Sequence, residues 1–136
     1  MTAKFKWNVR VYYEDTDAGG VVFYANYLRY MERARTECLR QLGFEHERLR
    51  QEFGVLFAVK NVTIAYKKPA RLDEELNVIS HLLSYRGASI NFQQNITNQQ
   101  EELITEAEVR VVCLNAETLK PSPMPELLLS ELVNVD

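Results

Sequence analysis

A single amphipathic segment in a chain that otherwise looks strand-like constrains the fold most. Between Val21 and Leu42, apolar side chains recur every three or four residues, and charged side chains fill the other faces. The apolar stripe consists of Leu28, Met31, Ala34, Cys38 and Leu42. This spacing is typical of an α-helix with one buried face. Gly43 follows directly and suits the left-handed conformation that often ends a helix. The sequence therefore predicts one long helix over residues 21–42.

The segments on either side of this helix have the spacing of β-strands. Five strands are predicted, at residues 5–13, 55–66, 76–84, 88–97 and 103–114. Alternation in the last two strands predicts one apolar face each, with Ala88, Ile90, Phe92, Gln94 and Ile96 on the first and Thr105, Ala107, Val109, Val111 and Cys113 on the second. In the run VLFAVKNVTIAY the stronger apolar residues change phase halfway along. A β-bulge near Lys60 and Asn61 would explain this change, because an extra residue moves all later side chains to the opposite face.

The connections between these segments predict how they assemble. Turns at Arg86–Gly87 and Asn98–Gln99 join the last three strands into antiparallel hairpins. Three prolines then precede ELLLSELV, which predicts a bend and a short C-terminal helix. A chain of 136 residues is about one domain long. We therefore expect a single α+β domain, residues 1–136, in which a five-stranded antiparallel sheet packs around one long helix.

Charge and composition exclude several classes of protein. The net charge is −3 and the basic residues are dispersed, which argues against a nucleic-acid binder. The N-terminal stretch MTAKFKWNVRVYY has no continuous apolar run, so neither a secretion signal nor a membrane span is expected there. The protein is predicted to be cytoplasmic. Cys38 and Cys113 lie within apolar stripes and are predicted to be buried thiols rather than a disulfide or metal site.

The stretch YYEDTDAGGVVFYANY, between the first strand and the helix, is the candidate functional region. It places Glu14, Asp15 and Asp17 beside Gly19 and Gly20, with no basic residue among them. Unpaired N–H groups at a helix start, with the positive end of the helix dipole, can stabilise negative charge that develops on a carbonyl oxygen. Glycine lets a ligand approach the backbone closely. This pattern predicts a site in which one carboxylate acts on a bound carbonyl group.

Other uses of these side chains fit less well. DTDAG begins like a calcium loop, but the twelfth position holds Asn26 rather than glutamate. Neighbouring carboxylates at one strand end point to different faces, which disfavours glycoside hydrolysis. His46 and His81 lack partners at zinc-ligand spacing, and no GxSxG motif supplies a nucleophilic serine. No metal or organic cofactor is expected, and an ordinary solvated loop is the simplest alternative.

The stretch RVYYEDTDAGGVVFYANYLRYMERARTE closely resembles the signature of the 4-hydroxybenzoyl-CoA thioesterase family of hotdog-fold proteins, in particular its tol-pal-associated acyl-CoA thioesterases of the YbgC type. ARLDEEL, YRGASINF, EAEVRVVCLN and LKPSPMP are similar to later segments of the same family, so the resemblance covers nearly the whole chain. It implies a hotdog fold and a homodimer or homotetramer. It also implies hydrolysis of an acyl-CoA thioester to a free acid and coenzyme A.

The resemblance also implies roles for individual residues. Asp17 is expected to be the catalytic carboxylate, as nucleophile or general base. Gly20 is expected in the substrate site, and the backbone N–H groups around Val22 to Tyr24 are expected to polarise the thioester carbonyl. A departure occurs at Tyr24, where YbgC-type members usually have histidine and relatives that act on aromatic acyl groups have tyrosine. The preferred acyl group is therefore left open.

The resemblance further implies that two chains share each site. Val59 and Lys60, at the predicted bulge, would then face the helix start of a second chain. The phosphates of coenzyme A would need cations in a chain that is acidic overall. The candidates are Lys60, Lys67, Lys68, Arg71 and Arg86. Arg86 is favoured because it precedes Gly87 at a hairpin turn and matches the RGAS segment of relatives.

Two alternative functions stay open at this point. One is a non-catalytic partner that binds acyl groups on acyl carrier protein within a membrane-associated lipid-synthesis assembly. The other is a hotdog dehydratase, which is disfavoured because the acidic loop contains no histidine for acid–base work. Turnover of a thioester panel would separate an enzyme from a binder.

Overall fold

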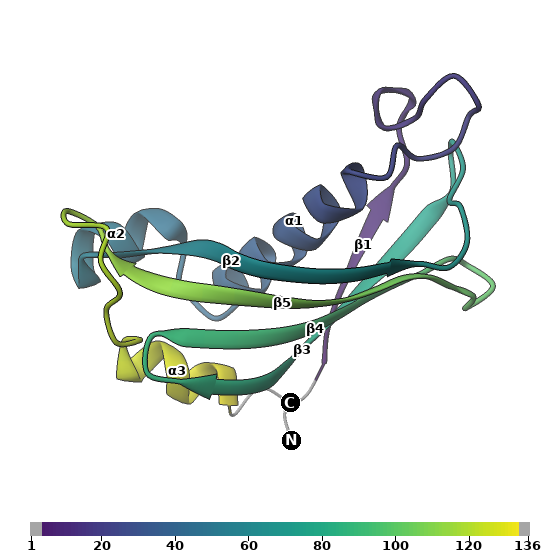
Figure 1. Ribbon diagram of the computed structural model, residues 1–136. Coiled ribbons are helices and arrows are strands. Elements are labelled where there is room, and N and C mark those ends of the chain that lie inside the picture. The colour runs from purple at the N-terminus through teal and green to yellow at the C-terminus, as the bar shows by residue number, and fades with distance from the viewer. Residues whose placement is uncertain (1–3, 134–136) are drawn as a thin grey trace.

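The computed structural model describes residues 4–133, so the first and last three residues of the predicted domain lie outside it. Its elements are β1 (Phe5–Arg10), a 3-10 turn η1 (Tyr13–Asp15), α1 (Asn26–Gln41), α2 (His46–Phe53), β2 (Val55–Tyr66), β3 (Glu75–Arg86), β4 (Ser89–Thr97), β5 (Leu103–Asn115) and α3 (Glu126–Val133). The α1 helix crosses one face of the curved sheet (Figure 1). This arrangement confirms the predicted hotdog fold, with a long helix, five strands and a short C-terminal helix.

The sheet has the strand order β1-β3-β4-β5-β2, and every neighbouring pair is antiparallel. The register between β2 and β5 shifts between Val59 and Asn61, which confirms the predicted bulge. Alternation also predicted the faces of β4 correctly, since Ile90, Phe92 and Ile96 are all buried. The order leaves β1 and β2 at the two edges of the sheet. The long strand β2 therefore has one side unpaired in a single chain.

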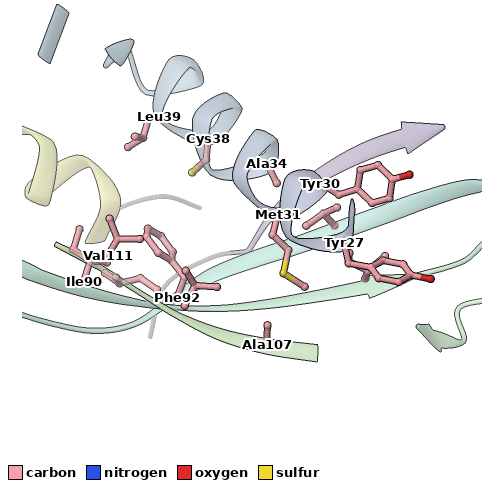
Figure 2. Close-up of a cluster of buried hydrophobic side chains, with 14 of the residues drawn as sticks. Tyr27, Tyr30, Met31, Ala34, Cys38, Leu39, Ile90, Phe92, Ala107 and Val111 are labelled. Atoms are coloured by element: carbon pink, nitrogen blue, oxygen red, sulfur yellow. The ribbon is translucent and has the colours of Figure 1, made fainter. Parts of the chain in front are cut away.

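The buried face of α1 is rotated from the predicted stripe. Met31, Ala34 and Cys38 are buried as expected, but Leu28 is 38% exposed. Tyr27 and Tyr30 take the place of Leu28 in the core. Figure 2 shows these residues pointing from α1 toward the strands, with Met31 directed at Ala107 of β5. The stripe thus begins with aromatic side chains at the end of α1 nearest the acidic loop.

The α1 helix also begins later than predicted. The segment expected to form its first turn gives its backbone donors to other partners. Val22 N–H donates to the carbonyl oxygen of Ala70 at 2.8 Å, and Phe23 N–H donates to that of Asp15 at 2.9 Å. Because these contacts fix the chain outside helical geometry, α1 begins only at Asn26.

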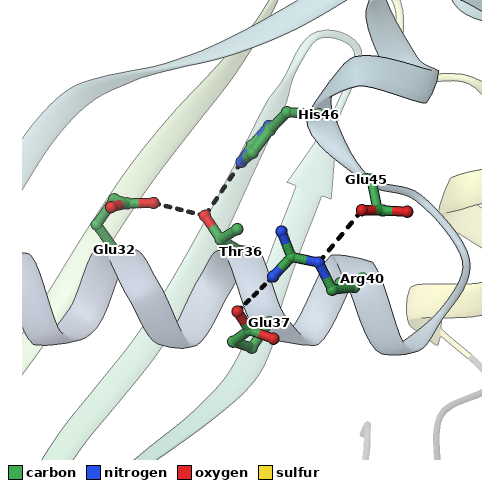
Figure 3. A network of polar contacts seen from close by, with 6 residues as sticks. All are labelled: Glu32, Thr36, Glu37, Arg40, Glu45 and His46. Atoms are coloured by element: carbon green, nitrogen blue, oxygen red, sulfur yellow. Dashed lines mark hydrogen bonds and ion pairs between the residues drawn. The ribbon is translucent and has the colours of Figure 1, made fainter.

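The sequence reasoning missed α2, which occupies the connection between α1 and β2. Only Leu49 is fully buried within this helix, and Phe53 is partly buried. Eight residues with so few apolar positions give too weak a periodicity to predict a helix. A hydrogen bond of 3.1 Å between Thr36 Oγ1 and His46 Nε2 ties the start of α2 to α1 (Figure 3).

The C-terminal segment closes one side of the domain, as predicted. Ser122 N–H donates to the carbonyl oxygen of Cys113 at 2.9 Å, so the proline bend follows the edge of β5. The α3 helix then buries Leu128 and Leu132 against the core. Cys113 and Cys38 are both buried and unpaired, as expected, and burial raises the pKa of each thiol to about 11. Among the helices of residues 4–133, none is both long and apolar enough to cross a membrane.

Candidate active site

The acidic loop between β1 and α1 forms a tight turn around Asp17. Asp17 N–H donates to the carbonyl oxygen of Val21 at 3.0 Å, and Gly20 N–H donates to that of Asp17 at 3.0 Å. Gly20 has a φ of +75°, which a residue with a Cβ adopts only with strain. These contacts hold Asp17 directly across the turn from Val21, on the segment that leads into α1.

The Asp17 side chain is exposed and lightly held. Its Oδ1 accepts the N–H of Gly19 at 2.9 Å. Within residues 4–133, no cationic group lies within 4.0 Å of this carboxylate. A Cβ added at Gly19 would make an ordinary van der Waals contact, 3.4 Å, with the same oxygen. The second carboxylate oxygen is therefore available to a water molecule or a substrate.

The two neighbouring acids differ from Asp17. Asp15 Oδ2 accepts Tyr12 N–H at 2.9 Å, and the Asp15 carbonyl accepts Asn26 Nδ2 at 2.8 Å. Asp15 thus ties the loop to the first residue of α1. Glu14 is exposed and makes no hydrogen bond among the described residues. Asp17 is the acid of this loop that is both fixed by the turn and open to solvent.

Only some of the backbone N–H groups predicted to polarise the thioester carbonyl, around Val22 to Tyr24, are available in the structure. The N–H groups of Val22 and Phe23 already donate to backbone carbonyls, so Val22 is not free to polarise a substrate through its N–H. The N–H groups of Tyr24 and Ala25 have no acceptor within the described part of the chain. They immediately precede α1, where the helix dipole is positive. A carbonyl oxygen placed here would meet two adjacent unpaired donors.

An aromatic cluster lies beside these donors. The Tyr24 ring is 62% exposed and meets the Tyr66 ring edge-on, with centroids 6.0 Å apart. Tyr27 lies 5.8 Å from Tyr66, and its hydroxyl accepts Ala70 N–H at 3.0 Å. Burial raises the pKa of Tyr27, so the hydroxyl stays protonated near neutral pH. The sequence reasoning did not identify Tyr66, because nothing in its own strand marks it as part of a site.

The predicted phosphate-binding cations differ in their availability. Lys68 forms an ion pair with Glu102, and Lys67 lies 3.6 Å from Glu106. Arg71 is exposed and forms no ion pair among residues 4–133. Its backbone forms an isolated antiparallel bridge with Val21, which places Arg71 beside the acidic loop. Sequence reasoning had no signal for this proximity, since the two segments are distant in the chain.

The other predicted substrate-binding residues lie away from Asp17 in a single chain. Tyr66, at one end of β2, packs on the aromatic residues that precede α1. Val59 is seven residues earlier on the same strand, roughly 23 Å away along it. Lys60 lies at the bulge and Arg86 ends β3, and both are exposed. Figure 1 shows the acidic loop and the β3–β4 turn at opposite ends of the sheet.

A cavity of about 190 Å³ lies beneath the C-terminal half of α1. Figure 2 shows Cys38 and Leu39 facing Ile90, Phe92 and Val111 across this region. Val59 lines the cavity from β2, and α3 closes it. Four polar side chains also reach it, and these are Glu32, Arg35, Thr36 and His46. The structure therefore separates a polar, exposed loop from an apolar cavity within one chain.

Among the described residues, no cluster of three or more His, Cys, Asp or Glu side chains could hold a metal ion. Residues 11–132 match the thioesterase-like superfamily. The chain belongs to this superfamily, which confirms the family that the sequence resembles, and it is a thioesterase of the hotdog fold.

Individual relatives agree with this assignment. The chain is 47% identical over 130 residues to the acyl-CoA thioester hydrolase YbgC of Escherichia coli O6:H1, covering 96% of each chain. It is 43% identical over 122 residues to the acyl-CoA thioesterase YbgC of Haemophilus influenzae, covering 90% of this chain and 89% of that one. The 1,4-dihydroxy-2-naphthoyl-CoA thioesterase Slr0204 from Synechocystis superposes with a TM-score of 0.88 over 96% of each chain at 19% identity, which shows a shared fold.

Proposed function

We propose that the protein hydrolyses acyl-CoA thioesters to a free acid and coenzyme A, with Asp17 as the catalytic carboxylate. The observation that carries this proposal is the exposed Asp17 side chain on a loop that ends in the N–H groups of Tyr24 and Ala25, which have no acceptor among residues 4–133. The relatives named as acyl-CoA thioesterases support the class of substrate.

The reaction uses the two kinds of group in turn. The thioester carbonyl oxygen accepts hydrogen bonds from Tyr24 and Ala25, which stabilises the negative charge that develops there. Asp17 then either adds to the carbonyl carbon or removes a proton from an attacking water. In the first route the C–S bond breaks to give a mixed anhydride, which water hydrolyses. In both routes the sulfur leaves as thiolate and takes up a proton, and both require the same carboxylate.

The proposal requires two chains for each site. The strand β2 is an edge of the sheet, and it carries two exposed apolar side chains. Val59 is 49% exposed and Val62 is 37% exposed. Antiparallel pairing of two β2 strands would cover these side chains and remove the open edge. It would also set the cavity beside Val59 of one chain against the Asp17 loop of the other. The acyl group then lies in one chain's cavity while its thioester carbon meets the partner's Asp17.

The coenzyme A moiety lies at the surface in this arrangement. Arg86 and Lys60 are exposed and form no ion pair among residues 4–133, so both are open to a phosphate group. Gly20 shapes the turn at the reacting end, because its positive φ sets the path of the loop. An acyl carrier protein could deliver the same acyl group. Comparing kcat/KM for the same acyl group on coenzyme A and on acyl carrier protein decides between the two carriers.

Release of free thiol from a panel of acyl-CoA substrates tests this function. The panel should include aliphatic chains of increasing length and one aromatic acyl group. We expect turnover that saturates with substrate and that depends on Asp17. Saturable binding of the same thioesters with no thiol release would overturn the proposal and make the protein a carrier or binding partner for acyl groups.

A further inference from the structure

The cavity is lined by a cationic side chain, that of Arg35, which has no ion-pair partner in the described part of the chain. Arg35, on α1, lines the cavity beside Cys38 and Leu39, and its side chain is partly buried. Among residues 4–133, no carboxylate oxygen lies within 4.0 Å of its guanidinium. Burial lowers the pKa of Arg35, and the charge of Glu32 opposes this effect only partly. A charge in such a place is costly unless something polar meets it.

The one hydrogen bond of Arg35 goes to a neutral amide. Its Nη1 donates to Gln94 Oε1 at 2.9 Å. The Gln94 amide nitrogen donates to the Met31 carbonyl at 2.9 Å and to Ser80 Oγ at 2.8 Å, and Gln94 is fully buried. These two bonds fix the amide so that its oxygen faces Arg35. A guanidinium has five N–H donors, so most of those on Arg35 have no acceptor among the described residues.

Arg40, further along α1, shows what a fully paired arginine looks like here. It donates to Glu37 on its own helix and to Glu45 before α2 (Figure 3). Carboxylates on α1 and just before α2 therefore neutralise Arg40. Arg35 is instead held at the cavity wall by an amide, which positions the guanidinium and leaves its other donors unused.

We infer that Arg35 determines which acyl groups this site accepts. Its free N–H groups donate to an oxygen acceptor, such as a hydroxyl, keto or carboxylate group, on the acyl chain that enters the cavity. This inference rests on the proposed thioester hydrolysis and specifies its substrate. The volume of about 190 Å³ within one chain has room for a short acyl chain or a single ring, since a cavity of roughly 150 Å³ holds benzene. Arg35 is a specificity residue and does not touch the reacting carbonyl.

Three four-carbon thioesters test the inference: butyryl-CoA, 3-hydroxybutyryl-CoA and succinyl-CoA. Wild-type kcat/KM should be higher for at least one oxygenated substrate than for butyryl-CoA, by about 10- to 100-fold, the range expected for a charge-assisted hydrogen bond. Arg35→Met should abolish this preference, so that the ratio of kcat/KM for the oxygenated substrate to that for butyryl-CoA falls to about one. The control is Arg33→Met, an exposed arginine on the same helix, which should keep the wild-type ratio.

A purely structural role for Arg35 predicts a different result. If Arg35 only holds Gln94 in place, Arg35→Met lowers kcat/KM for all three substrates by the same factor, and the inference is wrong. A wild-type preference for butyryl-CoA would also overturn it. If Arg35→Met does not fold, as judged by urea unfolding, the same comparison uses Arg35→Gln, which can still donate to Gln94 but carries no charge.

The inference can fail separately from the proposed hydrolysis. If the wild-type protein cleaves none of the three substrates, binding of their non-hydrolysable thioether analogues is measured by calorimetry. Tighter binding of an oxygenated analogue that is lost in Arg35→Met and kept in Arg33→Met supports the role of Arg35 even then. Equal binding of all three analogues, or a preference that survives Arg35→Met, overturns it.

Discussion

The two ends of α1 present opposite environments. Before its first residue, the acidic loop is exposed and polar, and backbone hydrogen bonds position its carboxylate. Beneath its C-terminal half, apolar side chains from α1, β2, β4, β5 and α3 enclose a cavity that Arg35 also lines, and Arg35 forms no ion pair within residues 4–133. Thioester hydrolysis needs both environments, because water must reach the carbonyl while the acyl chain leaves water. A single chain keeps them apart, and the proposed two-chain site would bring one of each together.

The largest effect should come from the carboxylate at the loop end. Asp17→Asn should lower kcat by roughly a thousandfold or more, with KM nearly unchanged, because asparagine is nearly isosteric but neither attacks nor accepts a proton. Steady-state kinetics on one acyl-CoA substrate measure both constants.

Matched variants of the neighbouring acids control for charge. Glu14→Gln should change kcat far less, because this side chain forms no hydrogen bond or ion pair in the described residues. Asp15→Asn should also change kcat far less, and it should lower the urea midpoint because Asp15 accepts Tyr12 N–H. Near-wild-type turnover in purified Asp17→Asn would remove the loop from the mechanism and make it an ordinary solvated turn.

The second largest effect should be the recovery of activity when a chain with a damaged loop pairs with a chain with a filled cavity. Asp17→Asn disables one half-site, and Val59→Trp fills the other, so each homodimer should be inactive. After the two variants are unfolded and refolded together, one site of a mixed dimer carries both lesions and the other carries neither. Activity should return to about half the wild-type level per mixed dimer.

The control for this experiment is each variant refolded alone at the same total concentration. Differently tagged chains allow mixed dimers to be isolated before the assay. Mixed dimers that stay as inactive as their parents would mean that each chain completes its own site, and the contrast between the two ends of α1 would lose its functional meaning.

Most of the fold could be predicted because local patterns and tertiary packing agree. Strict alternation in β4 and β5 identified their buried faces, and a change of phase in β2 located the bulge between Val59 and Asn61. The predicted start of α1 was wrong, and the reason is physical. Val22 and Phe23 look helical by composition, but their donors are taken by Ala70 and Asp15, and local propensity does not report such distant contacts.

The candidate site was only partly predictable. The acids and glycines of the loop form a contiguous motif, so Asp17 could be singled out from sequence. The cavity is assembled from six elements, and no sequence pattern indicates its volume. Arg35 reads as one more charged residue on an amphipathic helix. Its importance depends on Gln94, which lies 59 positions away and was predicted only as a member of an apolar face.

A smaller effect, on KM, should distinguish Arg86 from Arg71 as the cation that contacts the coenzyme A phosphates. Arg86→Ala should raise KM for an acyl-CoA by roughly three- to tenfold with little change in kcat, because a contact with a distant phosphate is equal in ground and transition states. The effect should shrink as salt is added. A phosphate-free thioester substrate is the control, and an equal loss on both substrates would argue against a phosphate contact.

The rise in KM should also be measured for Arg71→Ala, which removes a cation near the acidic loop. Arg71 lies beside the loop that holds Asp17, whereas Arg86 lies at the far end of the sheet. If the site is shared, Arg86→Ala should raise KM more than Arg71→Ala. The opposite order would place the coenzyme A phosphates on the chain that supplies Asp17.

The smallest effect should be found at Tyr24, where the side chain and the backbone have separable roles. Its hydroxyl makes no hydrogen bond among residues 4–133, and its ring is largely exposed beside Tyr66. If the backbone N–H polarises the carbonyl, Tyr24→Phe and Tyr24→His keep that donor and should change kcat by less than about threefold. A fall of about tenfold or more in Tyr24→Phe alone would instead assign catalysis to the phenol hydroxyl. A rise in Tyr24→His would indicate that a side-chain base can be added beside Asp17, and that the loop end still has unused catalytic capacity.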